Sequence, residues 1–94
     1  RNTKIVDMVK ALKEYDLDLD IYDPWVSPQE VEHEYGFAPL LTLEQHQYDA
    51  IVIAVAHDQF KQMSVNDFEK LGKAQHVLYD LKYILDQEYS DIRL

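Results

Sequence analysis

The sequence predicts an α/β domain of the three-layer, Rossmann-like kind with a mainly parallel sheet. Helical and strand periodicities alternate along its 94 residues, which suffice for one small hydrophobic core. The stretch "AIVIAVA" is continuously apolar and rich in β-branched residues, as is typical of a strand buried on both faces of a parallel sheet. Alternation of this kind requires crossover connections, which place helices on both faces of the sheet.

The first predicted element is a helix over residues 3–15. Its apolar residues Ile5, Val9 and Leu12 recur at helical spacing. An alternating α/β unit normally begins with a strand, whereas this sequence begins with a helix. We therefore expect that the first strand of the sheet precedes Arg1 and is missing from the chain.

The next predicted elements are a strand and a second helix. Strict alternation of apolar and acidic residues in "LDLDIYD" predicts a strand over 17–23. Asp23 precedes Pro24, which disfavours a helical conformation at Asp23. Ser27 is then positioned to cap a helix that has Pro28 in its first turn. Gly36 is a natural end for that helix.

The remaining elements are short, apart from one strong strand. The pattern predicts an extended piece at 37–41, one helical turn at 43–47, the central strand at 48–57, helices at 59–63 and 67–72, and a last strand at 76–80. Asp58 is predicted to cap the first of these two helices.

Composition excludes several classes of function. The net charge of −9, from 18 acidic and 9 basic residues, argues against binding to nucleic acid, which requires a basic face. The absence of cysteine excludes disulfides, thiolate metal sites and thiol nucleophiles from this sequence. Its apolar runs are far shorter than the ~20 residues of a membrane span, and its first residues do not have the basic-then-apolar pattern of a signal peptide. We expect a cytoplasmic protein that binds neither nucleic acid nor membranes.

Ligands of parallel sheets bind beyond the carboxyl ends of the strands. Two cations are predicted at this edge, and a small anion needs no more than one or two. Lys82 follows the last strand and could contact a phosphate, although a solvated lysine is equally compatible with the spacing. Arg1 precedes the first helical turn, whose free N–H groups also favour an anion.

Other polar residues near this edge have a structural interpretation that we favour. Asp23 could hold ribose hydroxyls in a dinucleotide fold, but the glycine turn is missing, so ordering the turn into Pro24 is the simpler role. His57 and Asp58 could form an acid–base pair, yet adjacent side chains seldom face each other. Trp25 is expected to be a partly buried lid over a sheet edge, or else to stack on a ligand or a neighbouring subunit.

The other histidines predict no metal site. They are isolated on polar segments and show no metal-ligand spacing; they are His33, His46 and His76. No residue of this sequence is predicted to be catalytic.

Four stretches, in order and spacing, resemble the C-terminal, UDP-binding domain of the UDP-glucose/GDP-mannose dehydrogenase family. They are "RNTKIVDMVKALKEY", "DIYDPWV", "YDAIVIAVAHDQF" and "VLYDLKYILD", and the likeness covers nearly the whole chain. The form "AVAHDQF" is most similar to the bacterial branch of UDP-N-acetyl-hexosamine 6-dehydrogenases, which serve the biosynthesis of surface polysaccharides.

The resemblance implies that the chain is one domain, residues 1–94, excised from a larger enzyme. Enzymes of this family also contain an N-terminal NAD-binding Rossmann domain and a central dimerising helix. Because of that helix, the intact protein is expected to be a homo-oligomer. They oxidise the primary alcohol of a UDP-sugar to a carboxylate in two steps that consume two NAD. Their nucleophilic cysteine lies outside this domain, so the isolated chain is expected to be folded but inactive.

The resemblance also implies roles for the two cations. Arg1 matches the arginine of an Asp-x-Arg-(Asn/Glu)-(Ser/Thr) pattern that reaches the NAD side of the interdomain cleft, which makes it a cofactor-binding candidate. Lys82 matches a basic residue that faces the UDP-sugar, which makes it a substrate-binding candidate. Many relatives have arginine there; lysine retains the charge without the bidentate geometry. Arg93 matches a family ending, but no role follows from it.

Two other classes remain open from the residues alone. A receiver-like signalling domain also alternates strands and helices and carries acids at strand ends, although it needs those acids clustered. A non-catalytic α/β interaction module could use Trp25 and the acidic helix after it.

Overall fold

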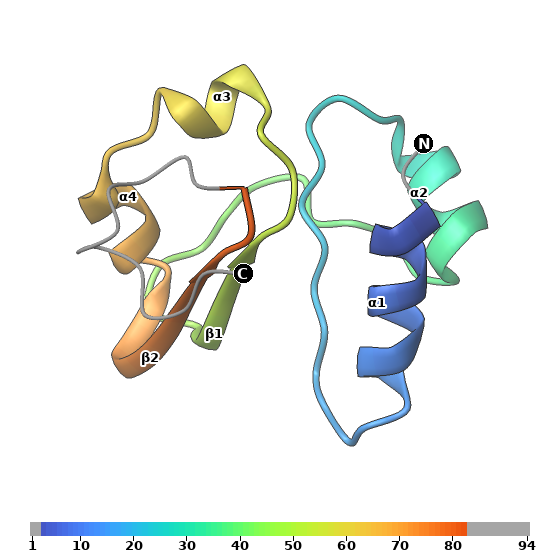
Figure 1. Cartoon of the computed structure of the whole chain (residues 1–94), viewed down its shortest axis with the longest axis horizontal. Coiled ribbons are helices and arrows are strands. Elements are labelled where there is room, and N and C mark those ends of the chain that lie inside the picture. Colours follow the sequence, from blue (N-terminus) through green and yellow to red (C-terminus); the bar gives the residue numbers. More distant parts are fainter. Residues whose placement is uncertain (1–2, 83–94) are drawn as a thin grey trace. The chain divides into compact units, whose positions relative to one another are not determined.

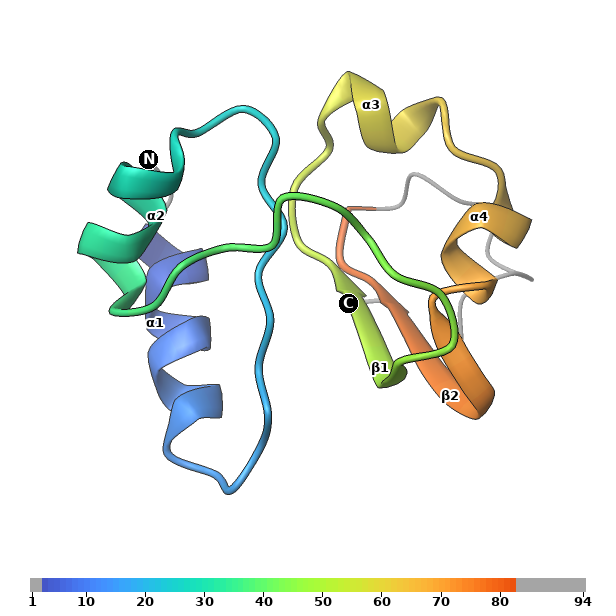
Figure 2. The same cartoon turned by 180° about the vertical axis from the view of Figure 1, so that it is seen from behind.

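The computed structural model describes residues 3–82 of the chain (Figures 1 and 2). Its contacts divide the chain into two compact units, Arg1–Leu43 and Glu44–Leu94. Among the described residues, no helix combines the length and the apolar character that crossing a membrane requires.

The first unit contains two helices that contact each other, α1 (Thr3–Lys13) and α2 (Pro28–Tyr35). Their apolar faces bury Val9, which is 6% exposed, and Val31, which is fully buried. The Lys13 ammonium donates a hydrogen bond of 2.9 Å to the carbonyl oxygen of Tyr35 and lies 5.0 Å from the centre of the Phe37 ring. The last turn of α1 therefore supplies a cation to the carboxyl end of α2, where the helix dipole favours one.

Local sequence chemistry sets both ends of α2, as predicted. Ser27 is the N-cap, and its hydroxyl oxygen accepts a hydrogen bond from the N–H of Glu30 at 3.2 Å. Pro28 occupies the first turn. Gly36 ends the helix in the left-handed conformation, with φ of 88°, and its N–H donates to the carbonyl oxygen of Glu32 at 2.8 Å.

The strand predicted over 17–23 is wrong. That segment has no regular secondary structure, and within residues 3–82 the sheet contains two strands, both in the second unit. A backbone hydrogen bond of 2.8 Å joins the N–H of Leu40 to the carbonyl oxygen of Ile21, and Leu17 is 55% exposed. Alternation specifies which residues share a face, but a strand also needs a ladder of hydrogen bonds with a partner.

A prediction in the connection to the second unit is also wrong. The helical turn predicted at 43–47 is absent, and the chain makes a non-helical turn at Gln45 and His46. Residues 37–41, predicted as an extended piece, are not part of a strand. His46 adopts a positive φ of 61°, and its N–H donates to the carbonyl oxygen of Lys70 at 2.7 Å. A contact distant in sequence thus decides this conformation, so local pattern could not predict it.

The second unit is an α/β arrangement with a parallel sheet, which confirms the predicted fold class. The strands β1 (Tyr48–Ile53) and β2 (Gly72–Asp80) pair in parallel, and two short helices connect them, α3 (Asp58–Lys61) and α4 (Val65–Glu69). Helix α4 packs against β2. The core consists of Ile53, Phe68 and Leu78, all at most 4% exposed, with Ile51, Phe60 and Met63 packed against it.

Strand β2 begins at Gly72, four residues before the predicted start. Tyr48 pairs with Gly72, but Ala50 pairs with Val77, so β2 accommodates an irregularity between these two points. The ring of His76 turns back over Gly72, where an added Cβ would lie 2.3 Å from the His76 Cγ atom. Gly72 is therefore required because the His76 ring approaches its backbone closely. The predicted role of Gly72 as the end of the preceding helix is wrong, since α4 ends at Glu69.

The close approach at Gly72 generates the first prediction. Gly72→Ala should lower the free energy of unfolding by about 1–3 kcal/mol, because the new methyl group overlaps the His76 ring. The loss should be much smaller when His76→Ala is already present. Urea denaturation of the two single variants and the double variant measures this coupling. An equal cost of Gly72→Ala in both backgrounds would show that the ring is not the obstacle.

Candidate functional site

The parallel pairing of β1 with β2 brings the ends of both strands to one edge of the sheet. Ile53 and Asp80, the last residues of the strands, are register partners. The N–H of Leu81 then donates to the carbonyl oxygen of Ile53 at 3.1 Å, which extends the pairing by one bond. We call the residues that follow the strands, 54–58 and 81–82, the carboxyl rim. This rim lies where ligands of parallel sheets bind.

Lys82 is the cation of the carboxyl rim. Its side chain is exposed, and its backbone N–H donates to the Oδ1 atom of Asp80 at 3.2 Å. Asp80 itself is fully buried. The structure thus places a positive charge at the predicted edge, while contact of Lys82 with a ligand stays a prediction.

His57 lies in the other part of the rim, directly before α3. It is the N-cap residue of α3 by backbone conformation, and its side chain makes no cap hydrogen bond. Its ring stacks on Phe60, with centroids 5.5 Å apart and planes 24° apart, and its Nε2 atom is buried.

Asp58 is the first residue of α3 and not its cap, so that prediction is wrong by one position. Its charge still suits the helix amino end.

Asp23 and Trp25 belong to the first unit. The Oδ1 atom of Asp23 accepts a hydrogen bond from the N–H of Trp25 at 3.0 Å. This bond spans Pro24 and is the side-chain-to-backbone turn that aspartate favours, which confirms the structural interpretation of Asp23. The Trp25 side chain is 61% exposed, more than was expected of a partly buried lid.

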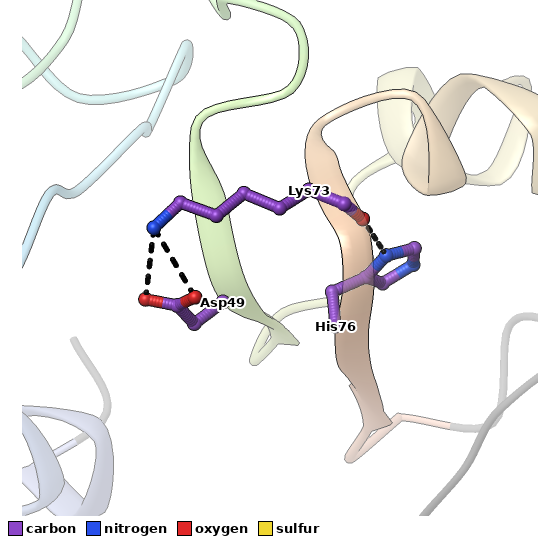
Figure 3. A network of polar contacts seen from close by, with 3 residues as sticks. All are labelled: Asp49, Lys73 and His76. Carbon is purple, nitrogen blue, oxygen red and sulfur yellow. Dashed lines mark hydrogen bonds and ion pairs between the residues drawn. The ribbon is translucent and has the colours of Figure 1, made fainter.

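A second polar cluster surrounds the irregular start of β2 (Figure 3). The Lys73 ammonium lies 3.2 and 3.4 Å from the two carboxylate oxygens of Asp49, and His76 Nδ1 lies 2.7 Å from the Lys73 carbonyl oxygen. His76 Nε2 contacts a carboxylate oxygen of Glu69.

This cluster corrects the sequence-based view of His76 as isolated. Its partner Glu69 lies seven residues earlier and is brought near by the packing of α4 on β2. The side chains of Lys73 and Asp49 are 54% and 83% exposed, so their ion pair contributes at most about 1 kcal/mol to stability. The arrangement holds the irregular part of β2 in place, which is a structural role.

Arg1, the predicted cofactor contact, and Arg93 lie outside the described residues. Within residues 3–82, histidine, aspartate and glutamate side chains form no group of three that could hold a metal ion.

Comparisons with known proteins are consistent along the whole chain. The family model described as "UDP-glucose/GDP-mannose dehydrogenase family, UDP binding domain" matches residues 1–87. UDP-N-acetyl-D-glucosamine 6-dehydrogenases of Pseudomonas aeruginosa and Salmonella typhi are 54% and 53% identical over 94 residues, which is 100% of this chain. Protein CapL of Staphylococcus aureus is 27% identical over 92 residues, 98% of the chain. No solved structure matches.

The relatives are much longer than this chain. The aligned region covers 22% of each of the three proteins. The similarity therefore concerns one part of a larger protein.

The turn at Asp23 generates the second prediction. Asp23→Ala should lower the free energy of unfolding by about 1 kcal/mol, because the Trp25 N–H loses its acceptor. Asp23→Asn should be close to the unsubstituted protein, because its amide oxygen can accept the same bond. Thermal denaturation of both variants measures the difference. Equal losses would contradict the turn role and would point to the charge of Asp23 instead.

Proposed function

The chain belongs to the UDP-glucose/GDP-mannose dehydrogenase family, as its UDP binding domain, and on that premise we propose that it binds the substrate of a UDP-N-acetylglucosamine 6-dehydrogenase. The choice of substrate rests on the identity of 54% and 53%, over all 94 residues, to two enzymes of that name. The rim position of Lys82 supports the binding role.

In the proposed reaction, the whole enzyme oxidises the primary alcohol of the UDP-sugar to a carboxylate in two steps, with NAD as the electron acceptor. This chain has no cysteine to act as nucleophile, so we assign the chemical steps to other domains of the same protein. The role proposed for this chain is to hold the nucleotide part of the substrate. A fixed nucleotide keeps the sugar carbon near the nicotinamide, and closure of the domains excludes water.

The described residues do not fit NAD. A dinucleotide pyrophosphate needs a glycine turn between a strand and a helix. The chain has two glycines: Gly36 ends α2, and Gly72 lies under the His76 ring at the start of β2. We therefore propose that an N-terminal domain binds NAD, and that Arg1 contacts the cofactor from the cleft side.

The proposed contact of this chain with the substrate is electrostatic. UDP carries two phosphates, and Lys82 presents a compact cation at the carboxyl rim. A charge-assisted hydrogen bond from an ammonium to a phosphate oxygen is about twice as strong as a neutral one. Lysine makes this contact as a point charge, without the fork of arginine.

The cellular setting follows from the same proposal. UDP-uronic acids are activated building blocks, so we place the enzyme in the cytoplasm, in the biosynthesis of surface polysaccharides. We also propose that the intact enzyme is a homo-oligomer whose domains close over the substrate.

The role of Lys82 generates the third prediction. In the intact dehydrogenase, Lys82→Ala should weaken UDP binding about tenfold, the value of one charge-assisted hydrogen bond. Lys73→Ala is the matched control, because Lys73 is an exposed lysine near the opposite end of β2. Isothermal titration calorimetry with UDP measures both dissociation constants. Equal affinity in the two variants would exclude Lys82 from the nucleotide site.

The division of labour generates the fourth prediction. The 94-residue chain, mixed with UDP-N-acetylglucosamine and NAD, should form no NADH, because the reacting groups lie in other domains. Addition of the intact dehydrogenase to the same mixture is the positive control. Production of NADH by the chain by itself would refute the proposal.

A further inference from the structure

Asp80 occupies a position on β2 where an apolar side chain would be expected. It lies two residues after Leu78, so both side chains point to the same face of the strand. Both residues are fully buried, and Leu78 is part of the core with Phe68. A buried carboxyl group is costly unless it makes hydrogen bonds, and buried polar groups are the informative exceptions in a protein interior. The position therefore indicates a role beyond packing.

Two hydrogen bonds fix the backbone as it leaves the sheet. The N–H of Leu81 donates to the carbonyl oxygen of Ile53 at 3.1 Å, which connects the Leu81 backbone to the end of β1. The N–H of Lys82 donates to the Oδ1 atom of Asp80 at 3.2 Å, which connects the Lys82 backbone to a buried side chain. The second bond closes a turn of the kind that aspartate favours. The direction in which Lys82 leaves the backbone is thus set by an anchored group.

We propose that Asp80 is a positioning residue, whose buried side chain holds the turn that presents Lys82 to the phosphates of the nucleotide sugar. This inference rests on the proposed function, because it requires Lys82 to contact UDP. Its benefit is preorganisation: a cation whose backbone is already ordered loses less conformational entropy on binding. The exposed Lys82 side chain remains free to change rotamer, so the turn fixes the position of its Cα atom and not that of its ammonium group.

Two substitutions of similar size separate positioning from packing. Asp80→Asn retains an oxygen that can accept the Lys82 N–H, whereas Asp80→Leu fills the same space without an acceptor. In the intact dehydrogenase, Asp80→Leu should weaken UDP binding by about five- to tenfold while the enzyme remains folded, as its circular dichroism spectrum would show. Asp80→Asn should bind UDP within about twofold of the unsubstituted enzyme.

A double-variant cycle with Lys82→Ala completes the test. If Asp80 acts through Lys82, Asp80→Leu should change the UDP dissociation constant little in the Lys82→Ala background. An equal loss in both backgrounds, or a normal affinity of Asp80→Leu, overturns the inference while the proposed function stands. If instead Lys82→Ala has normal affinity, the proposed contact fails and the inference fails with it. Asp80→Ala, which also lacks an acceptor, replaces the leucine variant if the latter does not fold.

Discussion

The parallel pairing of β1 with β2 is the constraint on which the candidate site depends. Because Ile53 and Asp80 are register partners, the segments that follow the two strands must emerge at one edge. The core formed by Ile53, Phe68 and Leu78 holds this pairing from one face. A shift of register by one residue would turn Asp80 out of the core and Tyr79 into it. The position of Lys82 is thus a consequence of how the strands are packed.

The proposed anion site is compatible with an acidic chain because charges act mainly at short range. The net charge is −9, yet charges more than about 8 Å apart are largely screened at physiological ionic strength. A single ammonium at about 4 Å from a phosphate oxygen interacts by about 4 kcal/mol near a protein surface. One nearby ammonium therefore outweighs the screened charge of the rest of the chain, so the proposed UDP site needs no basic surface beyond the rim.

Secondary structure was predicted correctly from the sequence where contacts within a few residues determine it. The predictions were wrong where contacts between residues distant in sequence determine it. Ser27 and Gly36 define α2 through contacts within a few residues. The apolar run of β1 correctly predicts a strand in a parallel sheet, but not one buried on both faces: Ile53 is buried, whereas Ala50 and Val52 are exposed. The segment 17–23 has the right alternation but no ladder, and Gly72 depends on a ring that folds back onto it. For the candidate site, the end of the last predicted strand indicated that Lys82 lies at the sheet edge. The hydrogen bond from its N–H to Asp80 has no signature in residue spacing.

We propose that the carboxyl rim of the second unit is the nucleotide-binding surface. The most direct measurement is a titration of the isotopically labelled 94-residue chain with UDP, followed by backbone amide chemical shifts. We expect the largest shifts at 54–58 and 81–82, and small shifts around Lys73 and His76 at the start of β2. Shifts concentrated at the start of β2 or on α2, with an unperturbed rim, would contradict it.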